Sequence, residues 1–163
     1  MCIRDRPNNN VFRQGALDAA VALKKSRTPI GRIKKLIKQL HRQGVKLTIL
    51  SANETTLIKA ALLRTGILRY FDSIFCGKSA ENAKDNPQSF EKARERLGTP
   101  KEETLVVDDS LYAIRTAASA GFPCVAVVDG EEAPEVRAEL EELALFCVSD
   151  FHELLDKLEG PNA

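Results

Sequence analysis

The stretch Thr104-Leu-Val-Val-Asp-Asp-Ser110 decides the fold of this 163-residue chain. Its first four residues form a mainly apolar run with strong strand propensity, and the run leads directly into Asp108 and Asp109. An unbroken apolar run is typical of a strand buried on both faces, as in a parallel sheet. Open parallel sheets bind their ligands beyond the carboxyl ends of the strands. The stretch therefore predicts a buried strand that carries two carboxylates to a binding site.

Strands and helices alternate on both sides of this stretch, with short loops between them. This alternation predicts a parallel sheet covered by helices. We therefore expect an α/β fold, with a Rossmann-like parallel sheet and helices on both faces, in three layers. The expected strands are 45–50, 73–76, 104–107, 124–128 and 145–148, and the expected helices are 11–25, 30–43, 54–64, 87–97, 111–120, 134–143 and 151–158.

The overall composition is that of an ordinary globular domain, with 44% hydrophobic and 29% charged residues and a net charge of +1. A net charge near zero gives no reason to expect a nucleic-acid or membrane partner. No apolar run approaches the roughly 20 residues that span a bilayer. The four cysteines show no CxxC spacing, so we expect free thiols in a reducing cytoplasm rather than a zinc site or disulfides. The oligomeric state stays open.

The beginning of the chain differs from the rest. Residues 1–10 are polar and charged, so they lack the apolar stretch of a signal peptide. The opening Met1-Cys-Ile-Arg-Asp-Arg6 resembles translated adapter sequence. We expect residues 1–10 to be a non-native or disordered leader, and we exclude them from the fold.

Asp108 and Asp109 are candidate metal ligands. Two adjacent carboxylates at the end of an apolar strand repel each other and are costly to desolvate. A bound Mg²⁺ would offset that cost, because it prefers carboxylate oxygens and retains several waters. In the alternative interpretation, one of the two aspartates caps the following helix.

Other strand ends carry further polar side chains. Ser51, with Ala52 and Asn53, follows the strand at 45–50 and turns into a helix, where a hydroxyl and backbone N–H groups can hold phosphate oxygens. Lys84 precedes another helix and would neutralise phosphate charge if it lay near the carboxylate pair. Asp129 ends the strand at 124–128. Taken singly, Ser51 also fits a turn or helix cap, and Lys84 also fits a solvated surface lysine.

Taken together and in this order, these features resemble motifs two, three and four of the haloacid dehalogenase superfamily. Residues 46–53 are similar to the second motif, a strand that ends in Ser or Thr. Lys84, with Pro87 and Phe90 after it, is similar to a Lys-Pro-x-Pro-x-x-Phe segment in which Asp85 here replaces the first proline. Residues 106–121 resemble the fourth motif. The resemblance covers about residues 29–158 and suggests the branch that contains β-phosphoglucomutase and phosphoglycolate phosphatase.

The resemblance implies a role for each candidate residue. Ser51, Ala52 and Asn53 would bind the transferring phosphoryl group, and Lys84 would stabilise its charge and orient the nucleophile. Asp108 and Asp109 would position Mg²⁺, one of them through water. The implied activity is that of a Mg²⁺-dependent phosphatase or phosphomutase acting on a small phosphorylated metabolite.

The superfamily's first motif, Asp-x-Asp-Gly-Thr, supplies its nucleophile and its general acid and base. No such sequence occurs in this chain. We therefore expect an inactive fragment that lacks the first strand and most of the cap, with residues 11–28 as a remnant of the helical cap and residues 29–159 as the core. The missing strand would lie between the strand ending at Ser51 and the strand ending at Asp108, so its loss predicts poor stability.

Three other classes of protein share some of these features. A non-catalytic phosphate- or Mg²⁺-binding protein would have lost the nucleophile naturally. A response-regulator receiver domain also has paired acids, a hydroxyl residue and a lysine, but its acid pair precedes the lysine by most of the domain. A nucleotide-binding Rossmann enzyme would carry Gly-x-Gly-x-x-Gly after a strand, and none is present.

Overall fold

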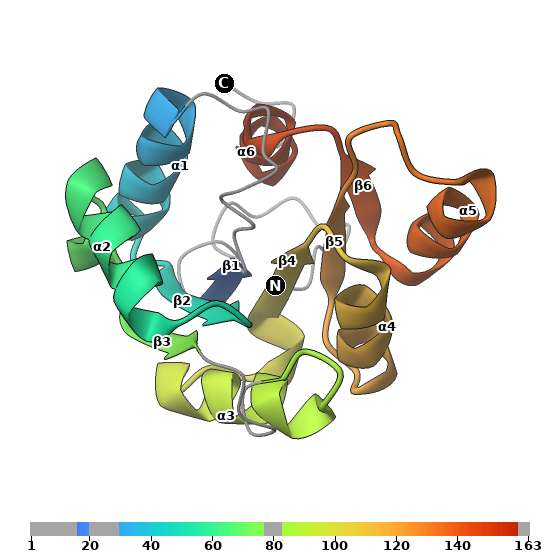
Figure 1. Cartoon of the computed structure of the whole chain (residues 1–163), viewed down its shortest axis with the longest axis horizontal. Helices are drawn as coiled ribbons and strands as arrows, with labels where there is room; N and C mark the ends of the chain where they lie inside the picture. Colours follow the sequence, from blue (N-terminus) through green and yellow to red (C-terminus); the bar gives the residue numbers. More distant parts are fainter. Residues whose placement is uncertain (1–15, 20–29, 77–82, 160–163) are drawn as a thin grey trace.

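The computed structural model describes residues 16–19, 30–76 and 83–159. Their six strands form one parallel sheet in the order β3-β2-β1-β4-β5-β6 (Figure 1). The strands are β1 (Ala16–Ala19), β2 (Lys46–Ser51), β3 (Ser73–Cys76), β4 (Thr104–Asp108), β5 (Cys124–Val127) and β6 (Phe146–Val148). The helices are α1 (Ile30–Arg42), α2 (Thr55–Thr65), α3 (Pro87–Leu97), α4 (Leu111–Ser119), α5 (Pro134–Leu143) and α6 (Phe151–Glu159), with short 3-10 helices η2 (Leu68–Tyr70) and η4 (Lys101–Glu103).

Helices cover both faces of the sheet, which confirms the expected three-layer α/β architecture. One buried cluster joins α1, α2 and α6 to one face of the sheet, and a second joins α3, α4 and α5 to the other. All five residues of β4 are buried, as a strand covered on both faces requires. Among the described helices, none has the length and apolar character needed to cross a bilayer.

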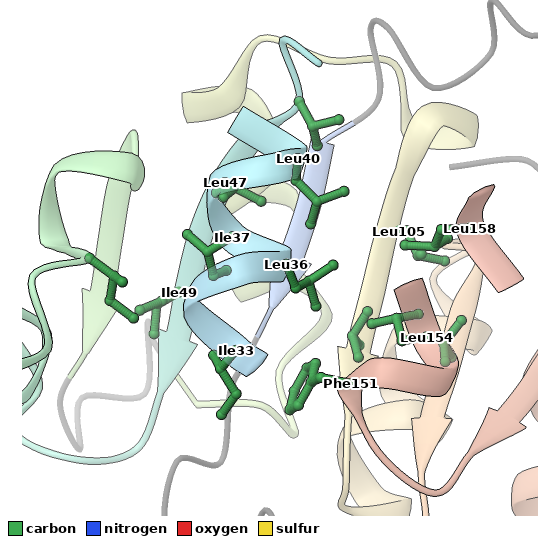
Figure 2. Close-up of a cluster of buried hydrophobic side chains, with 14 of the residues drawn as sticks. Ile33, Leu36, Ile37, Leu40, Leu47, Ile49, Leu105, Phe151, Leu154 and Leu158 are labelled. Carbon is green, nitrogen blue, oxygen red and sulfur yellow. The ribbon is translucent and has the colours of Figure 1, made fainter. Parts of the chain in front are cut away.

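The apolar spacing of α1 explains its position against the sheet. Ile33, Leu36, Ile37 and Leu40 follow the helical period and are each at most 3% exposed. Figure 2 shows these side chains directed toward β2 and toward Phe151 and Leu154 of α6, in the same cluster. Fully burying one such side chain contributes about 1.5–3 kcal/mol, so this stripe is a main source of the core's stability.

Two expectations about the start of the chain are wrong. Residues 16–19 form strand β1 and not part of a helix, and the central position of the sheet is occupied, because β1 pairs in parallel with both β2 and β4. Alanine favours helices, but unpaired backbone groups along two buried strand edges cost more than its weak local preference. The argument for poor stability from an open gap therefore does not apply. The leader at 1–10 and the rest of the proposed cap remnant at 11–28 lie outside the described residues.

Candidate functional site

All carboxyl strand ends meet at one edge of the sheet, because every described pairing is parallel. Asp18 of β1 lies opposite both Thr48 of β2 and Val106 of β4. Ser51 lies three residues after Thr48, and Asp109 lies three residues after Val106. Ser51 and Asp109 are therefore level with each other across the sheet. Two strand spacings separate β2 from β4, which is roughly 10 Å. The structure thus brings Ser51 and the carboxylate pair to the same edge.

Asp108 is held by contacts on both of its carboxylate oxygens. Its Oδ2 lies 2.5 Å from the Nζ of Lys84, and its Oδ1 accepts hydrogen bonds from the Ser110 backbone N–H (3.0 Å) and hydroxyl (2.5 Å). The Asp108 side chain is fully buried and that of Lys84 is 10% exposed. A buried carboxylate needs this kind of pairing, since desolvation without a partner is very costly.

The contact between Lys84 and Asp108 decides between the alternative interpretations of Lys84. Lys84 lies 24 residues before Asp108 in the chain, yet the two side chains form a charge-assisted hydrogen bond. A solvated surface lysine is therefore the wrong interpretation of Lys84. Neither aspartate occupies the N-cap position of α4, because Ser110 holds that position, without a capping hydrogen bond from its side chain.

Asp109 is more accessible than its neighbour. It directly follows β4 and is half-buried, whereas Asp108 is 1% exposed. Within residues 16–19, 30–76 and 83–159, no three His, Cys, Asp or Glu side chains come together as a metal site. The described residues thus offer a cation two adjacent carboxylates, of which that of Asp109 is the more open.

Ser51 ends β2 and is 8% exposed. Its hydroxyl oxygen accepts hydrogen bonds from the backbone N–H of Asn53 (3.2 Å) and from the Asn53 side-chain amide (3.3 Å). Ala52 and Asn53 are exposed, and α2 begins after Glu54, whose side chain makes no capping hydrogen bond. The turn therefore places a hydroxyl at the end of β2, directly before the start of α2.

Two further groups have other roles in the structure. The Asp129 carboxylate accepts the N–H of Glu131 at 2.9 Å, within a turn in which Glu132 accepts the N–H groups of Asp129 and Gly130. Burial raises the pKa of the Cys124 thiol to about 12, so this thiol is protonated at neutral pH and is no nucleophile there.

Ser110 is a site residue that the sequence interpretation missed. Its hydroxyl and backbone N–H both donate to Asp108 Oδ1, two residues earlier. The signal was present, since an Asp side chain commonly accepts from backbone two residues on.

The fold and the strand-end side chains define the class of the protein: a Rossmann-like α/β domain with polar side chains at the carboxyl edge of its sheet. The chain belongs to the haloacid dehalogenase-like hydrolases, because that family's model matches residues 4–121. This confirms the resemblance that the motifs suggested.

Individual relatives agree with the family. Pyrophosphatase PpaX of Halalkalibacterium halodurans is 36% identical over 91 residues, which are 56% of this chain and 42% of that protein. The phosphoglycolate phosphatase of Salmonella typhi is 30% identical over 124 residues, 76% of this chain and 48% of that protein. The structure assigned as HAD-hydrolase YfnB from Bacillus subtilis, bound to magnesium, is similar with a TM-score of 0.65 at 22% identity, over 78% of this chain and 53% of that one. The chain thus spans a little under half the length of these two curated relatives.

Proposed function

We propose that this chain is the core of a Mg²⁺-dependent phosphatase or phosphomutase that acts on a small phosphorylated metabolite. The observation that carries the proposal is the buried Lys84–Asp108 pair, next to Asp109 and at the same sheet edge as Ser51. The names of the two curated relatives, a pyrophosphatase and a phosphoglycolate phosphatase, support a phosphate-ester or phosphoanhydride substrate.

In this proposal Lys84 and Ser51 hold the phosphoryl group. A lysine ammonium has three N–H donors, and Asp108 accepts one of them, so two remain for phosphate oxygens. The ion pair fixes the ammonium in one place, which makes its charge available without reorganisation when charge develops on the phosphoryl group. The Ser51 hydroxyl and the backbone N–H of Ala52 would bind the remaining oxygens, and the Asn53 N–H would join them once phosphate replaces its 3.2 Å hydrogen bond to Ser51.

Asp109 and Asp108 fit a Mg²⁺ ion as a set of hard oxygen donors. We assign the direct contact to Asp109, because it is half-buried and reachable from solvent, whereas Asp108 is 1% exposed. Asp108 would then act on the ion through a bound water. The bound ion would supply charge neutralisation to the phosphoryl oxygens.

The printed sequence lacks the Asp-x-Asp-Gly-Thr motif, so these residues would bind phosphate without a carboxylate to attack it. We therefore expect no turnover from the 163 residues. This absence also supports a second candidate, a non-catalytic phosphate- or Mg²⁺-binding protein of the same family.

The first test measures Mg²⁺ binding by calorimetry or NMR titration. We expect weak binding to the chain, and Asp109→Asn should weaken it by at least about tenfold, as loss of a charged ligand or its support typically does. Asp129→Asn is the matched control: it is an exposed aspartate at a neighbouring strand end and should bind as the parent chain does. Unchanged binding in Asp109→Asn would show that the metal site is misassigned.

The second test measures hydrolysis of p-nitrophenyl phosphate and a panel of sugar phosphates with Mg²⁺. The chain should show no turnover, and a longer version that carries the Asp-x-Asp-Gly-Thr motif should show it. Turnover by the 163 residues that survives further purification and disappears in Asp109→Asn would reveal a nucleophile within them. A longer version that binds Mg²⁺ and phosphate without turnover would favour the non-catalytic candidate.

A further inference from the structure

Charge is divided unevenly along the chain. Residues 19–71 contain twelve Lys and Arg residues and one acid, Glu54, for a net charge of +11. Residues 72–163 contain nine Lys and Arg residues and twenty acids, for a net charge of −11. The overall value of +1 therefore hides two strongly and oppositely charged halves.

The sheet order turns this sequence asymmetry into a spatial one. The elements β2, α1 and α2 of the basic half lie toward one edge of the sheet, while β5, β6 and α5 of the acidic half lie toward the other (Figure 1). The helices α1 and α5 also pack on opposite faces. The molecule thus carries opposite charge at opposite ends.

The basic end is not neutralised within the described part of the chain. Helix α1 contains five Lys and Arg residues and no acid. Three of these residues are exposed: Lys35, Lys38 and Arg42. They lie three, four or seven residues apart, so they share one side of the helix. None of them forms an ion pair with a described residue. Some charges on other helices are paired locally instead, as in Arg137–Glu141 on α5 and Lys157–Glu153 on α6.

The acidic end offers a matching arrangement. Glu135 and Glu142 on α5 are exposed, lie seven residues apart on one side of the helix, and form no ion pair with a described residue. Seven residues is also the separation of Lys35 and Arg42, and along a helix it corresponds to about 10 Å. Two helices carrying these pairs have equal charge spacing and opposite sign.

We propose that the basic face of α1, formed by Lys35, Lys38 and Arg42, docks on the acidic face of α5, formed by Glu135 and Glu142, in a second copy of this chain. The contact is head-to-tail, since two different surfaces meet, and it leaves one free face of each kind at the ends of a dimer. The net charge of +1 gives little repulsion between copies, while the opposed ends attract each other. A nucleic acid is less favoured as the partner, because the acidic end would repel it. The proposal is independent of the phosphatase function.

An interaction between exposed charges should depend strongly on salt. The screening length falls from about 30 Å at 0.01 M salt to about 8 Å at 0.15 M. In sedimentation velocity at about 0.01 M salt, the weight-average sedimentation coefficient should rise with concentration. At about 0.15 M salt the dissociation constant should be at least about tenfold larger.

Two charge-reversal variants test the two faces separately. Lys35→Glu with Lys38→Glu removes the basic face, and Glu135→Lys with Glu142→Lys removes the acidic face. All four positions are exposed, and an acid at position 38 has Lys34 and Arg42 one turn away, so folding should be retained. Each variant alone should sediment as a monomer. A mixture of the two should associate again, because the intact basic face of one variant meets the intact acidic face of the other and the two reversed faces also complement each other.

A matched pair of single variants separates the proposed contact from a general effect of net charge. Lys38→Glu and Arg96→Glu change the charge equally, and both positions are exposed, but Arg96 lies on α3, outside both faces. Only Lys38→Glu should weaken the association. Three outcomes would overturn the proposal: a parent chain that stays monomeric at low salt, an equal loss of association in the two single variants, or association that disappears after nuclease treatment. The third outcome would indicate a polyanion as the partner.

Discussion

At the scale of single residues, Asp108 and Lys84 depend on each other. Asp108 is fully buried and its carboxylate is satisfied by Lys84 on one oxygen and by Ser110 on the other. A buried ion pair adds little net stability compared with an apolar pair, but removal of one partner leaves an uncompensated charge. The arrangement is therefore better suited to holding an ammonium group in place than to stabilising the fold.

This dependence predicts that Lys84→Met destabilises the chain by about 3 kcal/mol, because the Asp108 carboxylate loses its counter-charge. The double variant Lys84→Met with Asp108→Leu should recover much of the loss, since no buried charge remains. Urea unfolding measures both. Lys59→Met, at an exposed lysine, is the control and should change the free energy of unfolding by less than about 0.5 kcal/mol. An equally small change in Lys84→Met would contradict the importance of the pair.

The sequence named Lys84, Asp108, Asp109 and Ser51 as candidates, but it did not reveal their contacts. Strand-end position is local information, whereas the Lys84–Asp108 contact joins residues 24 apart. It follows from the packing of α3 and the adjoining loop near the ends of β2 and β4, which no periodicity encodes. The roles of these residues in phosphate and metal binding stay predictions.

At the scale of elements, most helices and strands were predictable within one or two residues. The helix expected at 30–43 is Ile30–Arg42, because its apolar stripe fixes the face and Gly44, with a φ of 78°, ends it in the left-handed conformation. The strands expected at 45–50 and 104–107 are Lys46–Ser51 and Thr104–Asp108. The exception is β1, whose short alanine-rich sequence has weak strand preference and depends on its two neighbours.

The start of α6 carries a pH-dependent cap. The carboxylate of Glu153 accepts the backbone N–H of Ser149 (2.8 Å) and the Ser149 hydroxyl (2.9 Å), and the carboxylate of Asp150 accepts the N–H groups of His152 and Glu153. The backbone hydrogen bond from Ser149, aided by the hydroxyl, holds the pKa of Glu153 below its usual value of 4.5. A lowered folded-state pKa means that the carboxylate stabilises the fold above about pH 4.5 and ceases to do so as pH falls through the folded-state pKa.

Glu153→Gln should therefore destabilise the chain by about 0.5–1 kcal/mol at pH 7, the usual range for a helix cap. The difference from the parent chain should shrink as pH falls through the folded-state pKa of Glu153, because the protonated carboxyl is then neutral like the glutamine amide. Thermal or urea unfolding at several pH values measures it, with Glu142→Gln, at an exposed position near the end of α5, as the control. A difference that stays constant from pH 7 to pH 3 would mean that the charge of Glu153 does not strengthen the cap.

At the scale of the whole molecule, β1 joins the two halves of the sheet. Four residues, Ala16–Ala19, pair with β2 on one side and with β4 on the other. Without them, both neighbours would expose a row of unpaired N–H and C=O groups in the middle of the sheet. The continuity of the sheet, and with it the approach of Ser51 to the carboxylate pair, therefore depends on the shortest part of the described chain.

This dependence predicts different effects of two substitutions at the same residue. Leu17→Pro removes a backbone N–H and cannot be accommodated in the middle of a sheet, so it should lower the midpoint of urea unfolding sharply or abolish cooperative unfolding. Leu17→Ala keeps the N–H and serves as the matched control, so it should fold cooperatively. Hydrogen exchange on the parent chain should show the amides of Leu17 and Asp18 protected nearly as strongly as those of β2 and β4, since a central strand opens only when the sheet opens. Two results together would contradict this prediction: the two amides exchange at the rate of an unstructured peptide, and the two variants are equally stable. The two halves of the sheet would then hold together without β1.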